Sequence, residues 1–477
     1  MMRSDVDVLR RMKVHFQEIF GDNAVSACVE SDSASGAARA DSARATQPTA
    51  EGHVGTPDAP FVFASAPGRV ELAGNHTDHQ GGCTISAAID RRIYALARPN
   101  TSRRIRMHSK GYGMLNLDCA DLDARVAERG TSLSLLRGMA ASYVRDGGTL
   151  CGFDAVVESD IPVGAGLSSS AAFEVLVGAM IRAVCKGGSA PARVDPAPLD
   201  PVPVEPAPVD HAPVDPAPLD LALFGAGSFD LVSLALEGAS VERERFGKPC
   251  GVQDQLACAL GGISAFDFAQ TIPQVTPIEF DWDASGYSLC LVNSACDHSA
   301  YTAQYAAVPT DMFAVAQYLG CERLVQVPFD EFLSRLPAIR AEAGDRATLR
   351  AMHFFEENKR VAHQRQALEK GDVATFLDGA RRSGASSAQF LQNVAPASTD
   401  AHTNQSALVV LALCEYLLDG RGACRIHGGG FGGSVLAFVP TAQAEDFERQ
   451  MNDLIGYQAC LPVLAGARGV HAERLGA

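Results

Sequence analysis

Apolar residues recur at two different spacings along the chain, and each spacing predicts one type of element. From Val8 to Phe20 they repeat every three or four positions, which predicts an amphipathic helix that ends before Gly21. Strand-like stretches follow over 61–66, 85–89 and 93–97. The same two patterns predict helices over 121–144, 170–184, 221–236, 311–319, 345–368, 373–383 and 445–455, and strands over 155–161, 287–293, 423–426 and 434–439.

Two stretches, 25–60 and 189–220, interrupt this patterning and are predicted to be disordered insertions. The first is rich in Ala, Ser, Asp and Thr, and it has no aromatic residue from Glu30 to Pro60. Such a stretch cannot bury enough apolar surface to order itself. The second repeats an acidic residue every fifth position with prolines between, which favours an extended, solvated arm. A spacer is a simpler interpretation of this arm than a docking site.

Composition narrows the class of protein. With 477 residues, of which 47% are hydrophobic, the chain can bury two cores. The formal charge of −16 argues against nucleic acid and acidic membranes as partners. We also expect a monomer. Thirteen cysteines without a C-x-x-C pair favour reduced thiols, and no apolar run suggests a membrane span or a secretory signal, so we expect a cytoplasmic location.

A stretch rich in glycine and serine, 161–172, leads into the predicted helix at 170–184 and overlaps its start. Backbone N–H groups at such a helix start are unpaired and lie at the positive end of the helix dipole, which suits an anion. Glu174, one turn after Ser170, shares its face and could help to hold a cation. A phosphate cradle with Mg²⁺ and a simple serine-capped helix are equally good interpretations of the loop alone.

Three potential metal ligands, His76, Asp78 and His79, fall within four residues. They allow a metal hydrolase, although no second cluster supplies the remaining ligands. The same donors and acceptors suit the hydroxyls of a sugar, which is the interpretation we favour. The third alternative is a structural turn in which Asn75 and Asp78 only cap backbone groups.

Arg69 and Asp254 are the candidate catalytic pair. Arg69 follows Pro-Gly in an apolar neighbourhood, which predicts a turn, and Asp254 lies in a segment bounded by Gly251. Phosphoryl transfer to a hydroxyl needs a carboxylate for the acceptor and a cation for the developing charge. Taken singly, Asp254 is as well explained as a helix cap and Arg69 as a surface ion-pair partner. The glycines of 428–433 suit either a tight hairpin or close approach to a ligand.

Taken together, the motifs resemble those of the galactokinase family, in the GHMP kinase superfamily. The resemblance rests on four segments in order, which are Pro-Gly-Arg with Gly-Asn-His-Thr-Asp-His, Gly-Leu-Ser-Ser-Ser-Ala, Cys-Gly-Val-Gln-Asp-Gln and Gly-Gly-Gly-Phe-Gly-Gly. It covers most of the chain outside the two insertions. It implies an α+β fold with an N-terminal domain over 1–285, a C-terminal domain over 286–477, and the active site in the cleft between them.

The resemblance also implies roles for single residues. Asp254 would receive or orient the proton of a sugar's anomeric hydroxyl, and Arg69 would stabilise that carboxylate and the phosphoryl group. Mg²⁺ would lie near Ser170 and Glu174. The triphosphate of ATP would lie on the loop residues Gly164, Gly166, Leu167, Ser168, Ser169 and Ser170. The sugar hydroxyls would meet Glu71, Asn75, His76, Asp78, Gly251 and Tyr305.

One departure concerns substrate choice. Most members of the family have Asn where this chain has Glu71, and Glu where it has Asn75. A carboxylate only accepts hydrogen bonds, whereas an amide also donates. The exchange could preserve one network or change selectivity at one hydroxyl. The resemblance therefore implies a galactose 1-kinase, with a kinase of another sugar and a catalytically silent sugar sensor as alternatives.

Overall fold

The computed structural model describes residues 3–21, 59–162, 164, 166–185, 230–248, 250–296, 301–396 and 405–475. The predicted insertion 189–220 lies outside these residues, as does 25–60 apart from its last two positions. The start of the helix predicted over 221–236 also lies outside them.

An eight-stranded sheet forms the first lobe. Its path runs β12-β1-β2-β5-β3-β4, and β6 and β7 extend it from β2. Only β3 and β5 pair in parallel, and the other pairs are antiparallel. The strands are β1 (Val62–Ala73), β2 (Cys83–Pro99), β3 (Arg104–Ser109), β4 (Gly113–Asp118), β5 (Phe153–Ser159), β6 (Ile263–Asp267), β7 (Gln274–Pro277) and β12 (His471–Arg474).

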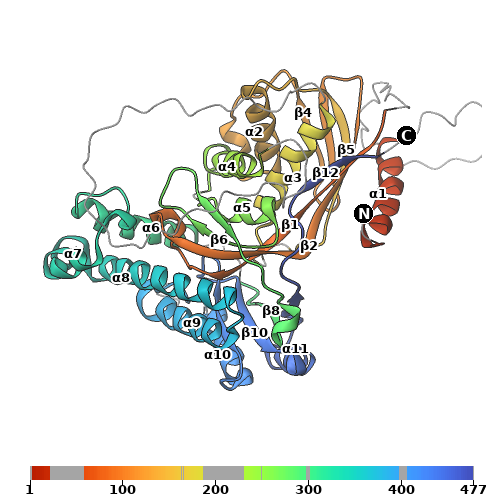
Figure 1. Ribbon diagram of the computed structural model, residues 1–477. Helices are drawn as coiled ribbons and strands as arrows, with labels where there is room; N and C mark the ends of the chain where they lie inside the picture. The colour runs from red at the N-terminus through yellow and green to blue at the C-terminus, as the bar shows by residue number, and fades with distance from the viewer. Residues whose placement is uncertain are drawn as a thin grey trace, which may run out of the picture.

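Helices cover both faces of this sheet. One face carries α2 (Ser132–Arg145), α3 (Ser169–Val184), α4 (Leu231–Val241) and α5 (Gln253–Leu260), whereas α1 (Arg3–Phe20) lies on the opposite face, as Figure 1 shows. The central helix α3 is apolar on almost every side, so it is buried between the sheet and its neighbouring helices. Met12 and Phe16 of α1 pack against Phe63 and Leu96.

A four-stranded antiparallel sheet and six helices form the second lobe. The strand order is β11-β8-β10-β9, with β8 (Tyr287–Asn293), β9 (Ala423–His427), β10 (Ser434–Pro440) and β11 (Cys460–Val463). In Figure 1 helices α8 and α9 lie side by side in this lobe. The helices are α6 (Thr302–Tyr318), α7 (Phe329–Ser334), α8 (Leu336–Glu369), α9 (Val373–Ser386), α10 (Ser406–Leu418) and α11 (Ala444–Ile455).

The α+β class predicted from the motifs is confirmed, and most predicted elements are found with shifted ends. One prediction is wrong: Pro67-Gly68 is not a turn but part of β1, where the ladder with β2 is irregular between Pro67 and Arg69. The stretches 85–89 and 93–97 belong to one long strand, β2. The chain also returns to the first lobe, because β12 pairs with β1. None of the helices within the described residues is long and apolar enough to cross a membrane.

A cluster of aromatic rings packs α9 and β10 against the segment between β7 and β8, and it supports a test of the packing. Phe376 on α9 is fully buried and meets the rings of Trp282 and Phe438, both at 5.5 Å between centroids. We expect Phe376→Ala to lower the free energy of unfolding by about 3–5 kcal/mol, because it removes a fully packed ring. Trp282 is the only tryptophan, so its fluorescence reports urea unfolding.

The matched control is Tyr416→Ala on α10, where the side chain is 75% exposed. This variant should stay within about 0.5 kcal/mol of the parent. Equal losses in the two variants would contradict the packing described here.

Candidate active site

Strand β1 positions Arg69 and Glu71 on one face, since alternate residues of a strand point the same way. Both are only 5% exposed. Gly68 lets β1 approach the 161–170 loop, because a Cβ atom there would lie 2.9 Å from the carbonyl oxygen of Leu167. The backbone N–H of Arg69 donates to that same carbonyl. The glycine therefore serves a close approach between strand and loop rather than a turn.

The 161–170 loop leads into α3 through residues with left-handed backbone. Gly164, Gly166 and Ser168 have φ of 75°, 73° and 58°. Ser168 is the residue before α3, yet its side chain does not cap the helix. Its hydroxyl instead donates to Oδ2 of Asp254 at 2.5 Å. The simple serine-cap interpretation is therefore wrong for Ser168, and the first N–H groups of α3 receive no bond from it.

Arg69 joins the loop to Asp254, which lies in the first turn of α5. Its Nε donates to Oδ1 of Asp254 at 2.8 Å, and its Nη1 donates to the carbonyl oxygen of Gly166 at 2.7 Å. Burial raises the pKa of Asp254, but the charge and hydrogen bond of Arg69 and the bond from Ser168 outweigh it. The pKa of Asp254 consequently lies below its ordinary value, and this side chain is a carboxylate.

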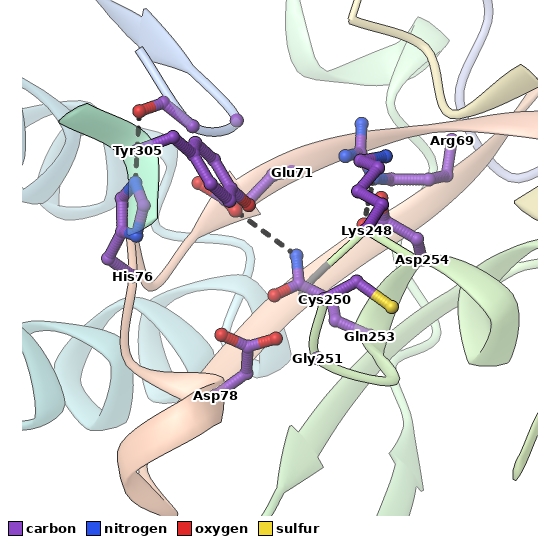
Figure 2. A pocket seen from close by; sticks show the side chains of 12 residues that line it. Arg69, Glu71, His76, Asp78, Lys248, Cys250, Gly251, Gln253, Asp254 and Tyr305 are labelled. Carbon is purple, nitrogen blue, oxygen red and sulfur yellow. Dashed lines mark hydrogen bonds and ion pairs between the residues drawn. The ribbon is translucent and has the colours of Figure 1, made fainter. Parts of the chain in front are cut away.

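A polar pocket opens beside this pair, as Figure 2 shows. Arg69, Lys248 and Asp254 lie together at one end, whereas His76, Asp78 and Tyr305 lie apart from them. The pocket thus has a cationic end next to the loop and an end rich in acceptors. Its lining residues are Arg69, Glu71, His76, Asp78, Lys248, Cys250, Gly251, Gln253, Asp254, Tyr305, Gly428 and Gly429.

Asp78 has space for its carboxylate because residue 251 is glycine. A Cβ atom at Gly251 would lie 1.6 Å from Oδ2 of Asp78. Burial raises the pKa of Asp78 to about 7, and the negative charges of Asp254 and Glu71 add to this effect. The bond from the His79 N–H to Oδ1 opposes it only in part. Asp78 is therefore a carboxyl group poised to exchange hydrogen bonds with ligand hydroxyls.

Glu71 and Asn75, the exchanged pair of the sequence, contact each other. Nδ2 of Asn75 donates to Oε1 of Glu71 at 3.1 Å and to the carbonyl of Gly428 at 2.6 Å. Glu71 lines the pocket, while Asn75 is fully buried behind it and accepts from Asn393. The two exchanged residues thus form one hydrogen-bonded pair, and the carboxylate of Glu71 is the member that lines the pocket.

The second lobe holds Glu71 in place through β9. Arg425 is fully buried, and its Nη2 donates to Oε1 of Glu71 at 2.8 Å. Nε2 of His427 accepts from the N–H of Glu71 at 2.9 Å. Burial, together with Arg69 and Arg425, lowers the pKa of His427, so the ring is neutral and its proton lies on Nδ1. The lobes are thus joined directly beneath the pocket.

A second cluster surrounds Ser170 at the start of α3. Ser170 Oγ donates to Oε1 of Glu242 at 2.8 Å, and Lys248 Nζ lies 3.0 Å from that same oxygen. Gln255 donates to both Glu242 and Glu174. Glu174 is fully buried, and its Oε1 has no partner. Burial and the charge of Glu242 raise the pKa of Glu174 well above its ordinary value, and a cation nearby would lower it again and favour the carboxylate form.

Four of these residues were not singled out by the sequence, namely Glu242, Lys248, Arg425 and His427. Glu242 begins a charged run, Glu-Arg-Glu-Arg, which is typical of a solvated surface. Arg425 lies between Cys424 and Ile426 in an otherwise apolar strand. The arginine at that position was the one feature of the sequence that could have indicated a buried polar contact, because a charge in a buried strand needs a partner.

The alternative of a metal hydrolase gains no support from His76. Its Nε2 contacts the carbonyl oxygen of Gly429 at 3.0 Å instead of a centre shared with Asp78 and His79. Within the part of the chain that the structure describes, no group of three His, Cys, Asp or Glu side chains is arranged to hold a metal.

Two family models match the chain. The galactokinase galactose-binding signature matches residues 51–99, which contain Arg69 and the Glu71 to Asp78 segment. The GHMP kinase N-terminal domain matches residues 134–194, which contain the 161–170 loop and α3. Over these two segments the chain is similar to the galactokinases and to the wider GHMP kinases. The two matched stretches contain Arg69 and Asp78, which line the pocket, and the loop beside its cationic end.

Curated galactokinases are similar to this chain over most of its length. The galactokinase of Lactobacillus helveticus is 27% identical over 83% of this chain and 91% of its own. That of Roseiflexus sp. (strain RS-1) is 27% identical over 86% and 93%. The solved galactokinase of Lactococcus lactis, complexed with galactose, has a TM-score of 0.69 and 20% identity and covers 98% of this chain and all of its own. The mevalonate kinase of Methanococcus jannaschii, with a TM-score of 0.51 and 14% identity over 87% and 98%, shares the fold.

The raised pKa of Asp78 predicts a pH dependence of stability. A carboxyl whose pKa rises from 3.8 to about 7 on folding stabilises the folded state fully below pH 3.8, and this contribution is lost as the pH rises through 7. Asp78→Asn removes the titration. The free energy of unfolding of Asp78→Asn minus that of the parent should therefore rise between pH 4 and 7 and then level off. Urea unfolding at several pH values measures it. A difference independent of pH would show that Asp78 titrates normally.

Proposed function

We propose that this protein is a galactokinase, which transfers the γ-phosphoryl group of ATP to the anomeric hydroxyl of galactose and releases ADP. The observation that carries this proposal is the Arg69 to Asp254 pair, because it ties the 161–170 loop to the polar pocket within a few ångströms. A kinase of this class needs such a junction between nucleotide and acceptor.

The nucleotide end rests on the 161–170 loop. The N–H groups at the start of α3 receive no side-chain cap from Ser168, and they form the positive end of the helix dipole. The triphosphate would therefore bind there. The sugar oxygen forms a bond to the γ-phosphorus as the bond to the β–γ bridging oxygen breaks, and ADP leaves with that oxygen. Arg69 and Lys248 would offset the charge on the transferring group.

The acceptor end rests on Asp254 and the opposite side of the pocket. Its lowered pKa makes Asp254 better suited to orient the anomeric hydroxyl and take its proton late in transfer than to remove the proton beforehand. Glu71, His76, Asp78, Gly251 and Tyr305 line the pocket and would bind the other hydroxyls. Asn75 does not line it, so we assign Asn75 a positioning role behind Glu71.

Mg²⁺ fits the cluster at Ser170, because the hydroxyl and the carboxylates of Glu242 and Glu174 are hard oxygen donors, and Oε1 of Glu174 is unpartnered. Ser170 and Glu242 would hold the ion, with Glu174 behind them. A bound Mg²⁺ would neutralise charge on the phosphates.

In the same proposal the enzyme works as a monomer in the cytoplasm, where ATP is abundant.

Substitution of Asp254 separates transfer from nucleotide binding. We expect Asp254→Asn to lower kcat roughly 10²- to 10⁴-fold, because the amide cannot accept the proton, while the Kd for ATP changes little. Coupled ADP release and calorimetry measure the two quantities. The matched control is Asp78→Asn, which makes the same chemical change at the far end of the pocket and should raise KM for the sugar more than it lowers kcat. Undiminished turnover in Asp254→Asn would refute the assignment of Asp254.

A panel of sugars tests the substrate. With ATP and Mg²⁺ in each reaction, galactose should give the highest kcat/KM, because the exchange of Glu71 and Asn75 keeps one carboxylate and one amide in contact. A clear preference for another sugar would replace galactose but keep the kinase. ATP binding without ADP release for any sugar would favour the silent sensor.

A further inference from the structure

Two thiols meet at the far end of the helix that carries the 161–170 loop. Cys151 lies two residues before β5, and Cys185 is the C-cap residue of α3. Their Sγ atoms are 2.9 Å apart, and the N–H of Cys151 donates to Sγ of Cys185 at 3.2 Å. A disulfide bond requires the sulfurs to approach only about 0.9 Å further. We propose that Cys151 and Cys185 form a peroxide-oxidisable thiol pair, independent of the proposed activity.

The surroundings hold both residues in this position. The hydroxyl of Tyr143 donates to the carbonyl of Cys185 at 2.9 Å. Arg474 donates to the carbonyls of Ala183 and Val184, the two residues before Cys185. Cys151 is half-buried, whereas Cys185 is 3% exposed. A small oxidant therefore reaches Cys151 first, and Cys185 is the protected partner.

The two thiols have different chemical roles. The hydrogen bond from Cys185 lowers the pKa of Cys151, against the effect of burial, while the same contact and burial raise the pKa of Cys185. The Cys151 thiolate attacks one oxygen of a hydroperoxide, the O–O bond breaks, and the hydroxide or alkoxide leaves with a proton from solvent. The Cys185 sulfur then attacks the resulting sulfenic acid. Its proton and the sulfenic hydroxyl leave as water, and the disulfide remains.

The disulfide would close a covalent ring around one structural unit. The chain between Cys151 and Cys185 contains all of β5, the 161–170 loop and α3. A crosslink across this unit restricts the unfolded chain and therefore stabilises the folded state. Oxidation would thus fix the base of the helix whose other end carries Ser168 and Ser170.

The test uses the full chain and hydrogen peroxide. After treatment and blocking of the remaining thiols, peptide mapping without reductant should show Cys151 linked to Cys185, with a loss of two free thiols. Dithiothreitol should reverse the link, and the oxidised protein should unfold at a higher temperature than the reduced one. The proposal is overturned if both residues remain thiols while other half-buried cysteines are oxidised, or if Cys151 links to Cys119.

Two variants sharpen the result. Cys185→Ser should leave Cys151 as a sulfenic acid that dimedone captures, and peroxide should no longer raise the unfolding temperature. Cys119→Ser is the matched control, because Cys119 donates to the carbonyl of Cys151 but is not part of the pair, and it should still form the disulfide. Absence of a dimedone adduct in a folded Cys185→Ser protein would contradict the role of Cys151. Mapping of the wild-type chain decides the matter if that variant does not fold.

Discussion

The structure depends on one buried arginine. Arg69 extends from a strand in the core of the first lobe and binds Asp254 on α5 and Gly166 of the 161–170 loop. Removing a charge from water is costly unless partners satisfy it, so the guanidinium draws these segments, far apart in sequence, to one point. The loop leads into the uncapped start of α3, where we propose that phosphate binds, and α5 carries the carboxylate of Asp254. The two hydrogen bonds of Arg69, one from Nε and one from Nη1, therefore fix how far the loop lies from the carboxylate of Asp254.

A second buried arginine, Arg425, connects the second lobe to β1. Arg425 and His427 on β9 bind the side chain and backbone of Glu71, two residues from Arg69 on the same strand. Asn75 adds a bond to Gly428 at the start of the glycine loop. The pocket consequently has residues of both lobes in contact beneath it, and a change at Glu71 or Asn75 affects the joint between lobes as well as ligand recognition. In this chain the two residues are hydrogen-bonded to each other.

The sequence predicted the parts of the site that lie in local motifs. The 161–170 loop, Arg69, Asp78 and Asp254 could be singled out because their motifs occur together in one order, although each has a structural explanation when taken singly. Glu242 and Lys248 could not, since a charged run at a helix end resembles a solvated surface and its burial depends on packing with α3 and α5. The Pro-Gly turn failed because close approach to Leu167, not chain reversal, requires Gly68. The return of β12 to β1 is a pairing across the whole chain, for which the sequence contains no local signal.

In the proposed function, Asp254 contacts the anomeric hydroxyl while Arg69 contacts the phosphoryl group. A crystal structure with galactose and a non-hydrolysable ATP analogue tests both contacts. We expect the anomeric oxygen within hydrogen-bond distance of Asp254, at roughly 2.6–3.2 Å, and the γ-phosphate between Arg69 and the start of α3. A sugar bound with its anomeric hydroxyl toward Asp78, or a nucleotide bound away from the 161–170 loop, would contradict this expectation.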